Sequence, residues 1–170
     1  MKRLYFVRHG QSEMNVSGHY AGSYNTPLTA EGRKQAHEAG KQAKNLGIDY
    51  IVCSPLSRAH DTAKIIAKEI GYDERDIHLN SLFVERDFGR LEGTPWSPDI
   101  DLDGIADVES DETLLKRARM ALDFLETLEA DTVLVASHGA FGRALRHHAM
   151  IDFPFSHPHR IENAEILQLI

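Results

Sequence analysis

Four groups of polar residues in this 170-residue chain could carry phosphate chemistry, and they fall at or near the ends of short apolar runs. In the first group, Arg8 and His9 come directly after the apolar residues 4–7. Arginine binds phosphate oxygens through a bidentate fork, and a neutral histidine can attack phosphorus as a nucleophile. The other groups are residues 54–58, Glu85 and residues 137–139.

The elements that position these groups are predicted from the spacing of apolar residues. Apolar runs predict strands over residues 3–8, 50–53, 79–84, 132–136 and 164–169. Helical spacing predicts helices over residues 29–46, 56–70, 111–129 and 139–150. Because strands and helices alternate, we expect an α/β fold, a three-layer α/β/α sandwich whose mostly parallel central sheet has helices on both faces. Residues 10–27 are polar and glycine-containing, which predicts a long loop or an irregular first turn.

The length of the chain suits one domain with a substantial core, so we expect residues 1–170 to form a single domain. Residues 86–110 differ from the rest because glycine and proline recur and residues 99–103 form an acidic run. We interpret this segment as a short cap insertion. If the acidic run overhangs the pocket, it would disfavour highly anionic substrates such as bisphosphates.

The four polar groups are expected to converge, since the carboxyl ends of parallel strands lie along one edge of a sheet. Helix N-termini near Leu56 and Gly139 would add positive dipole ends to that edge. Two arginines there could hold a phosphate while one imidazole attacks phosphorus, and the second imidazole, if protonated, could donate to the phosphoryl oxygens. A glutamate could protonate the leaving alkoxide and then activate water. This scheme requires no metal and no cofactor.

The bulk properties exclude several other classes of function. A net charge of −7 argues against general binding to nucleic acid or to anionic membranes. The apolar run near the N-terminus is too short for a signal-peptide core or a membrane span, so we expect a cytoplasmic protein. The single cysteine, Cys53, excludes an internal disulfide and is expected to be a buried small hydrophobe. We expect no metal site at His147 and His148, because adjacent helical side chains point about 100° apart.

The ordered set of motifs resembles the histidine phosphatase superfamily, in its phosphoglycerate mutase-like branch. The resemblance spans nearly the whole chain, and a late His-Gly after an early Arg-His-Gly makes the set specific. The matching stretches are residues 8–13 with Asn15, 25–29 with Gly32, 54–59, 82–85, 88–89, 92–93 and 137–139.

The resemblance implies a role for each matching residue. His9 would be the phosphorylated nucleophile, and Glu85 would be the general acid and base. The remaining catalytic residues would form the phosphate pocket: Arg8, Arg58 and His138. Further phosphate or substrate contacts would come from Asn15, Ser12, Gly139 and Asn163.

The leading hypothesis is a metal-independent phosphatase that hydrolyses small-molecule phosphomonoesters through a phosphohistidine. The short segment between Glu85 and His138 favours a phosphatase over a mutase, since a mutase must exclude water from its intermediate. Mutase-type phosphoryl transfer and a phospho-ligand-binding module without turnover are the alternatives, and a monomer and a homo-oligomer are both open. Plausible pocket walls are Phe88, Arg90, Leu91, Trp96, Phe153 and Phe155, with His157, His159 and Arg160 at the rim.

Overall fold

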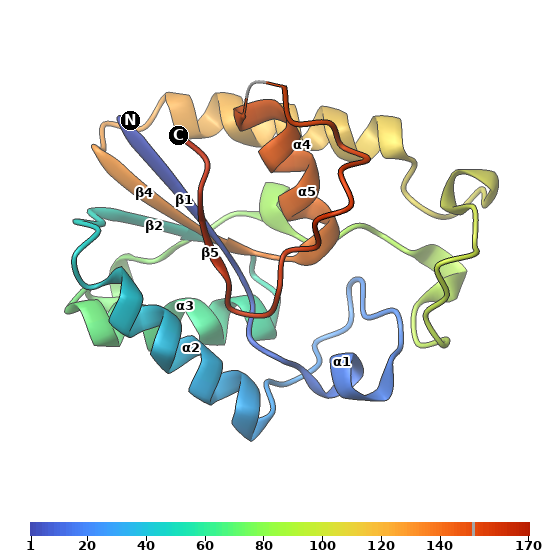
Figure 1. Cartoon of the computed structure of the whole chain (residues 1–170), viewed down its shortest axis with the longest axis horizontal. Coiled ribbons are helices and arrows are strands. Elements are labelled where there is room, and N and C mark those ends of the chain that lie inside the picture. The colour runs from blue at the N-terminus through green and yellow to red at the C-terminus, as the bar shows by residue number, and fades with distance from the viewer. Residues whose placement is uncertain (151) are drawn as a thin grey trace.

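The computed structural model describes residues 1–150 and 152–170 and shows a three-layer α/β fold around one five-stranded sheet (Figure 1). The strand order is β3-β2-β4-β1-β5. The first four strands run parallel, and only β5 runs antiparallel to its neighbour β1, so the prediction of a mostly parallel sheet is confirmed. The strands are β1 (Arg3–Arg8), β2 (Tyr50–Cys53), β3 (His78–Leu79), β4 (Thr132–Ser137) and β5 (Ile166–Gln168).

Helices cover both faces of the sheet, which explains why its central strands are apolar on both sides. Successive side chains of β1 alternate between the faces, so Leu4 and Phe6 join one core cluster while Tyr5 and Val7 join the other. In Figure 1, α4 and α5 lie above the sheet and α2 and α3 lie below it. The helices are α1 (Glu13–Ser17), α2 (Ala30–Ala43), α3 (Ser57–Ile70), α4 (Asp111–Glu126) and α5 (Gly139–Ala149).

Two local predictions differ from the structure, and hydrogen bonds between side chains and nearby backbone N–H groups explain both differences. The strand expected over 79–84 is limited to two residues, because the Asn80 side chain accepts from Leu82 N at 2.9 Å and caps a 3-10 turn, Ser81–Phe83. The loop expected over 10–27 contains the short helix α1. A capping box between Ser12 and Asn15 starts this helix.

The segment 86–110 holds only two 3-10 turns, Gly89–Leu91 and Leu102–Gly104. Its ends are joined by the buried Arg86, which donates to the Glu109 carbonyl and pairs with Asp103 and Asp111. A buried cation with several acceptors can order a segment that has few apolar residues of its own. Among the residues described, no helix is long and apolar enough to cross a membrane.

Candidate active site

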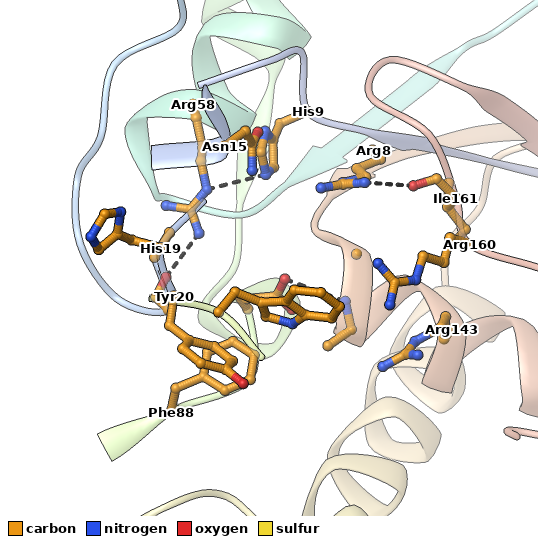
Figure 2. Close-up of a pocket in the computed structure, with 16 residues that line it drawn as sticks. Arg8, His9, Asn15, His19, Tyr20, Arg58, Phe88, Arg143, Arg160 and Ile161 are labelled. Atoms are coloured by element: carbon orange, nitrogen blue, oxygen red, sulfur yellow. Dashed lines mark hydrogen bonds between the residues drawn. The ribbon is translucent and has the colours of Figure 1, made fainter. Parts of the chain in front are cut away.

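The polar groups converge around a cavity at the carboxyl ends of β1 and β4, as the strand-end argument predicts (Figure 2). Its volume is about 220 Å³. The lining includes Arg8, His9, Asn15, Arg58, Glu85 and Gly139, together with Tyr20, Phe88, Trp96, Arg143 and Arg160.

His9 lies just past the end of β1 and is buried, with its two ring nitrogens in different environments. Nδ1 lies 2.7 Å from the Gly10 carbonyl oxygen, which can only accept, so Nδ1 carries the proton of the neutral ring. Nε2 then accepts from Arg58 Nε at 3.2 Å. Burial lowers the pKa of His9 well below 6.5, and the charges of Arg58 and Arg8 lower this pKa further. The site therefore holds a neutral imidazole whose Nε2 carries the lone pair, which here accepts the Arg58 hydrogen bond.

Arg58 lies in the first turn of α3 and is a buried cation without a carboxylate partner among the residues described. Its Nη1 donates to the Tyr24 carbonyl at 2.7 Å and its Nη2 to the Gly22 carbonyl at 2.8 Å. Burial lowers the pKa of Arg58 to about 10, which leaves the guanidinium charged at neutral pH. Because a buried unpaired charge is costly, this arrangement favours an anionic ligand.

The loop that holds Arg58 is itself held by Glu92. The Glu92 carboxylate accepts from Ser23 N at 3.0 Å, from Ser23 Oγ at 2.6 Å and from Phe88 N at 3.3 Å. Gly22 adopts φ +46°, and a Cβ there would lie 1.9 Å from Glu92 Oε1. The role of Glu92 as an anchor was not anticipated, because no periodicity links it to residues 22–24.

Arg8 and His138 each keep one buried polar nitrogen that has no hydrogen-bond partner in the described part of the chain. Arg8 Nη1 donates to the Ile161 carbonyl at 2.7 Å, whereas Arg8 Nε is unpaired and lies 3.4 Å from the place of a Cβ on Gly139. His138 Nε2 lies 2.8 Å from Ser54 Oγ, whereas Nδ1 is unpaired. Buried polar atoms normally have partners, so this pair indicates a ligand that supplies acceptor atoms.

His138 is neutral like His9, so only one of its ring nitrogens can donate a hydrogen bond. Burial lowers the pKa of His138 well below 6.5, with Arg58 and His9 adding to the shift, so the protonated ring considered from the sequence is disfavoured. Ser54 Oγ already accepts from Leu56 N at 3.2 Å and can donate its own proton to Nε2. The remaining ring proton then lies on Nδ1, and a neutral His138 can still donate from there.

Glu85 contacts the N-terminus of α5 and lines the cavity. Its Oε1 accepts from Phe141 N at 3.0 Å and from Arg86 N at 2.9 Å, and its Oε2 lies 3.3 Å from Ala140 N. These backbone N–H groups, two of them at the N-terminus of α5, fix the orientation of the carboxyl group. The carboxyl group is thus held in place at the cavity wall.

Not every predicted contact residue lies at the cavity. Asn15 and Gly139 line it, whereas Ser12 and Asn163 do not. His138 is also outside the lining, behind His9, with the two ring centres 5.3 Å apart. Ser12 Oγ caps α1 through Asn15 N, while Asn163 Nδ2 donates to the His9 carbonyl at 3.0 Å and to Asn15 Oδ1 at 3.2 Å. Ser12 and Asn163 therefore support the residues that line the cavity.

The expected walls are only partly present. Phe88, Trp96 and Arg160 line the cavity. The other residues expected at the walls and rim lie outside the lining: Arg90, Leu91, Phe153, Phe155, His157 and His159. The acidic run 99–103 also lies outside the lining, and Asp103 pairs with Arg86. Part of the run lines a neighbouring pocket together with Arg143, and its effect on bisphosphates stays a prediction.

Arg143 is a lining residue that sequence reasoning missed. It lies on α5 four positions after Gly139, a spacing that places two residues on one helix face. Since Gly139 was a predicted site residue, this spacing was the signal that could have revealed Arg143. Burial lowers the pKa of Arg143, and the nearby Glu85 raises it.

Comparison with protein families matches nearly the whole chain. A model described as the histidine phosphatase superfamily (branch 1) matches residues 4–169. A probable phosphoglycerate mutase of Salmonella arizonae, GpmB, is 36% identical over 154 residues, which cover 82% of this chain and 70% of that protein. Its counterpart in Citrobacter koseri has the same identity and coverage over 154 residues.

Solved structures share the architecture along almost the full length. A Mycobacterium tuberculosis protein is 30% identical, with a TM-score of 0.81 over 97% of this chain and 89% of its own. A mutant phosphoserine phosphatase of Entamoeba histolytica, in complex with phosphoserine, is 28% identical, with a TM-score of 0.80 over 99% and 90%. A mycobacterial glucosyl-3-phosphoglycerate phosphatase, at 22% identity and a TM-score of 0.84 over 99% and 92%, shares the fold.

Proposed function

The chain belongs to the histidine phosphatase superfamily, and from this membership and the cavity geometry we propose that it hydrolyses small-molecule phosphomonoesters through a phosphohistidine on His9. The observation that carries the proposal is the neutral His9 ring, whose unprotonated Nε2 lies 3.2 Å from Arg58 Nε. A phosphate oxygen that takes over the Arg58 N–H would release the Nε2 lone pair for attack.

In the first step, the Nε2–phosphorus bond forms while the bond from phosphorus to the ester oxygen breaks. Arg58 Nε, Arg8 Nε and His138 Nδ1 donate to the phosphoryl oxygens, where negative charge must be stabilised. Protonated Glu85 gives its proton to the departing alkoxide, and Asn15 adds a polar contact at the cavity wall.

In the second step, the Glu85 carboxylate takes a proton from water as the water oxygen attacks phosphorus. The Nε2–phosphorus bond breaks, inorganic phosphate leaves, and both His9 and Glu85 return to their starting states. This scheme needs no metal ion. We also propose that residues 1–170 act as one domain and that residues 86–110 form its short cap, which leaves the phosphohistidine open to water.

Mutase-type phosphoryl transfer is the second candidate, and the names of the bacterial relatives favour it. The same phosphohistidine would then pass its phosphoryl group to a second hydroxyl group. The two candidates differ in whether inorganic phosphate accumulates when a phosphorylated hydroxy acid is supplied.

The test is hydrolysis of p-nitrophenyl phosphate by the purified protein in excess EDTA, beside His9→Ala. We expect wild-type turnover to survive EDTA and to fall by roughly 10³-fold or more in His9→Ala, because the nucleophile is lost. His37→Ala is the control, since His37 is exposed on α2 and pairs with Glu69 outside the cavity.

Substantial activity in His9→Ala would contradict the phosphohistidine route. Loss of wild-type activity in EDTA would contradict the metal-free scheme. Phosphoryl transfer between hydroxyl groups without release of phosphate would assign the mutase instead.

A further inference from the structure

Two arginines from separate elements line the cavity beside the proposed phosphate pocket. Arg143 projects from α5, and Arg160 comes from the segment that precedes β5. In Figure 2 both lie to the right of the cavity, apart from His9 and Arg58 at the upper left, and their guanidinium groups point inward. They add two positive charges to a cavity that already contains Arg8 and Arg58.

These two guanidinium groups differ from most other arginines of the chain in having no acidic partner. Within residues 1–150 and 152–170, neither forms a hydrogen bond or an ion pair. Most of the other arginines are paired: Arg33 with Asp61, Arg75 with Asp73, Arg86 with Asp103 and Asp111, Arg90 with Asp107, Arg117 with Glu109, and Arg119 with Asp123. With 26 acidic residues against 19 basic ones, the chain has a surplus of acids to pair with. Two unpaired arginines in one cavity therefore favour an external anion.

Aromatic rings hold both arginines in a way that leaves their donors free. The Arg160 guanidinium carbon lies 4.6 Å from the centre of the Trp96 ring, and that of Arg143 lies 5.7 Å from the centre of the Phe155 ring. Stacking uses the flat face of a guanidinium, whereas the N–H groups lie in its plane and stay available for a bidentate contact. The rings thus orient the two guanidinium groups while the N–H donors of both stay free to bind a ligand.

We propose that Arg143 and Arg160 form a second anion site, so that the preferred substrates are small phosphomonoesters that carry a second anionic group, a carboxylate or a phosphate. The inference rests on the proposed function, because it assigns the transferred phosphoryl group to Arg8, Arg58 and His138. Those donors suffice for one phosphoryl group, so Arg143 and Arg160 are left for the other end of the substrate.

The test compares kcat/KM for O-phosphoserine with that for O-phosphoethanolamine, which differs from it by one carboxylate. A second pair, propane-1,3-diol bisphosphate and propyl phosphate, differs by one phosphate. The enzymes are wild type, Arg143→Gln, Arg160→Gln and Arg119→Gln. Arg119 is the matched control because it is a half-exposed arginine on α4 that pairs with Asp123 outside the cavity.

In one of the two pairs, we expect Arg143→Gln and Arg160→Gln each to lower kcat/KM for the compound with the second anionic group. This loss should exceed the loss for the compound without that group by roughly tenfold or more. A selective loss in the first pair assigns a carboxylate, and a selective loss in the second assigns a phosphate. Equal losses within both pairs would overturn the second anion site. Arg160 is exposed, so its variant keeps the test valid if Arg143→Gln fails to fold.

Calorimetric binding of the same four compounds to His9→Ala separates this inference from the proposed function. One outcome is that wild type hydrolyses none of the four compounds, while Arg160→Gln in the His9→Ala background selectively weakens binding of a compound with the second anionic group. That outcome refutes hydrolysis and supports the anion site. If wild type hydrolyses them with equal losses in the arginine variants, hydrolysis stands and the anion site is refuted.

Discussion

At the residue scale, hydrogen bonds to backbone atoms and one hydroxyl set the protonation of both histidines. The Gly10 carbonyl keeps a proton on Nδ1 of His9, and the Ser54 hydroxyl can direct the proton of His138 to its Nδ1. One ring then offers a lone pair and the other offers a donor, although both are neutral because they are buried. Neutral rings with assigned protons suit nucleophilic attack better than a pair of charged rings would.

Glu85→Gln tests the acid role at this scale. Glutamine keeps the volume of the side chain but cannot donate a carboxylic proton, so we expect kcat/KM for phosphoethanolamine to fall about 100-fold. For p-nitrophenyl phosphate the fall should be less than about tenfold, because nitrophenolate leaves with little need of a proton. Steady-state kinetics on both substrates, with a melting curve to check folding, measure the difference. An equal loss for the two substrates would remove Glu85 from the acid role.

At the element scale, the segment 86–110 acts on the site through side chains that reach other elements. Its Glu92 holds residues 22–24, whose carbonyls in turn orient Arg58. Just ahead of this segment, Glu85 contacts the first N–H groups of α5. A stretch with little regular structure can therefore position both a phosphate donor and the proposed acid.

Glu92→Ala tests this linkage between elements. Without the carboxylate, the loop over residues 22–24 loses two hydrogen bonds and holds Arg58 less firmly, so we expect kcat/KM for p-nitrophenyl phosphate to fall about tenfold. The inhibition constant for inorganic phosphate should rise in parallel, which a purely global loss of stability would not cause. Glu112→Ala, at an exposed position on α4, should behave as wild type. Unchanged phosphate inhibition in Glu92→Ala would disprove the linkage.

At the scale of the whole molecule, an acidic chain concentrates positive charge in one cavity. The net charge is −7, yet among the residues that the structure describes, four arginines and a single carboxylate, that of Glu85, line the cavity. Such local fields draw small anions into a site while the rest of the surface repels polyanions. His9 at the cavity wall and His138, whose ring centre lies 5.3 Å from that of His9, are both buried and neutral, and this couples folding to pH.

The free energy of unfolding should fall as the pH drops below 6.5. The pKa values of His9 and His138 lie below 6.5 in the folded state, so the unfolded chain binds protons first as the pH falls. This contribution to stability is therefore present above pH 6.5 and is lost as the pH falls towards the folded-state pKa values of the two histidines. We expect a loss of about 1 kcal/mol for each histidine between pH 7.0 and 5.5.

Urea unfolding of wild type and His9→Asn at pH 7.0 and 5.5 measures this effect. Phosphate is left out of the buffers because a ligand of the native state would mask it. The decline should be smaller by about 1 kcal/mol in His9→Asn, which has one fewer buried histidine. The same decline in both proteins would show that His9 is not the source.

The sequence by itself determined the α/β class, the mostly parallel sheet, the strand-end positions of Arg8 and His138, and the position of Arg58 at the start of the helix that follows β2. These features follow from short-range rules: apolar periodicity selects strands and helices, and parallel strands present their carboxyl ends at one edge. Thr29 illustrates how local such signals are, since its hydroxyl caps α2 by accepting from Gly32 N at 3.0 Å.

Only the tertiary structure decided which side chains face the cavity and which support it from behind. Ser12 and Asn163 resembled ligand contacts but lie outside the lining, whereas Arg143 lines it from an element far from residue 9. The strand order β3-β2-β4-β1-β5 and the anchoring of residues 22–24 by Glu92 also depend on contacts between distant segments. Periodicity describes each segment alone, while these contacts arise from how the segments pack together, which no local pattern encodes.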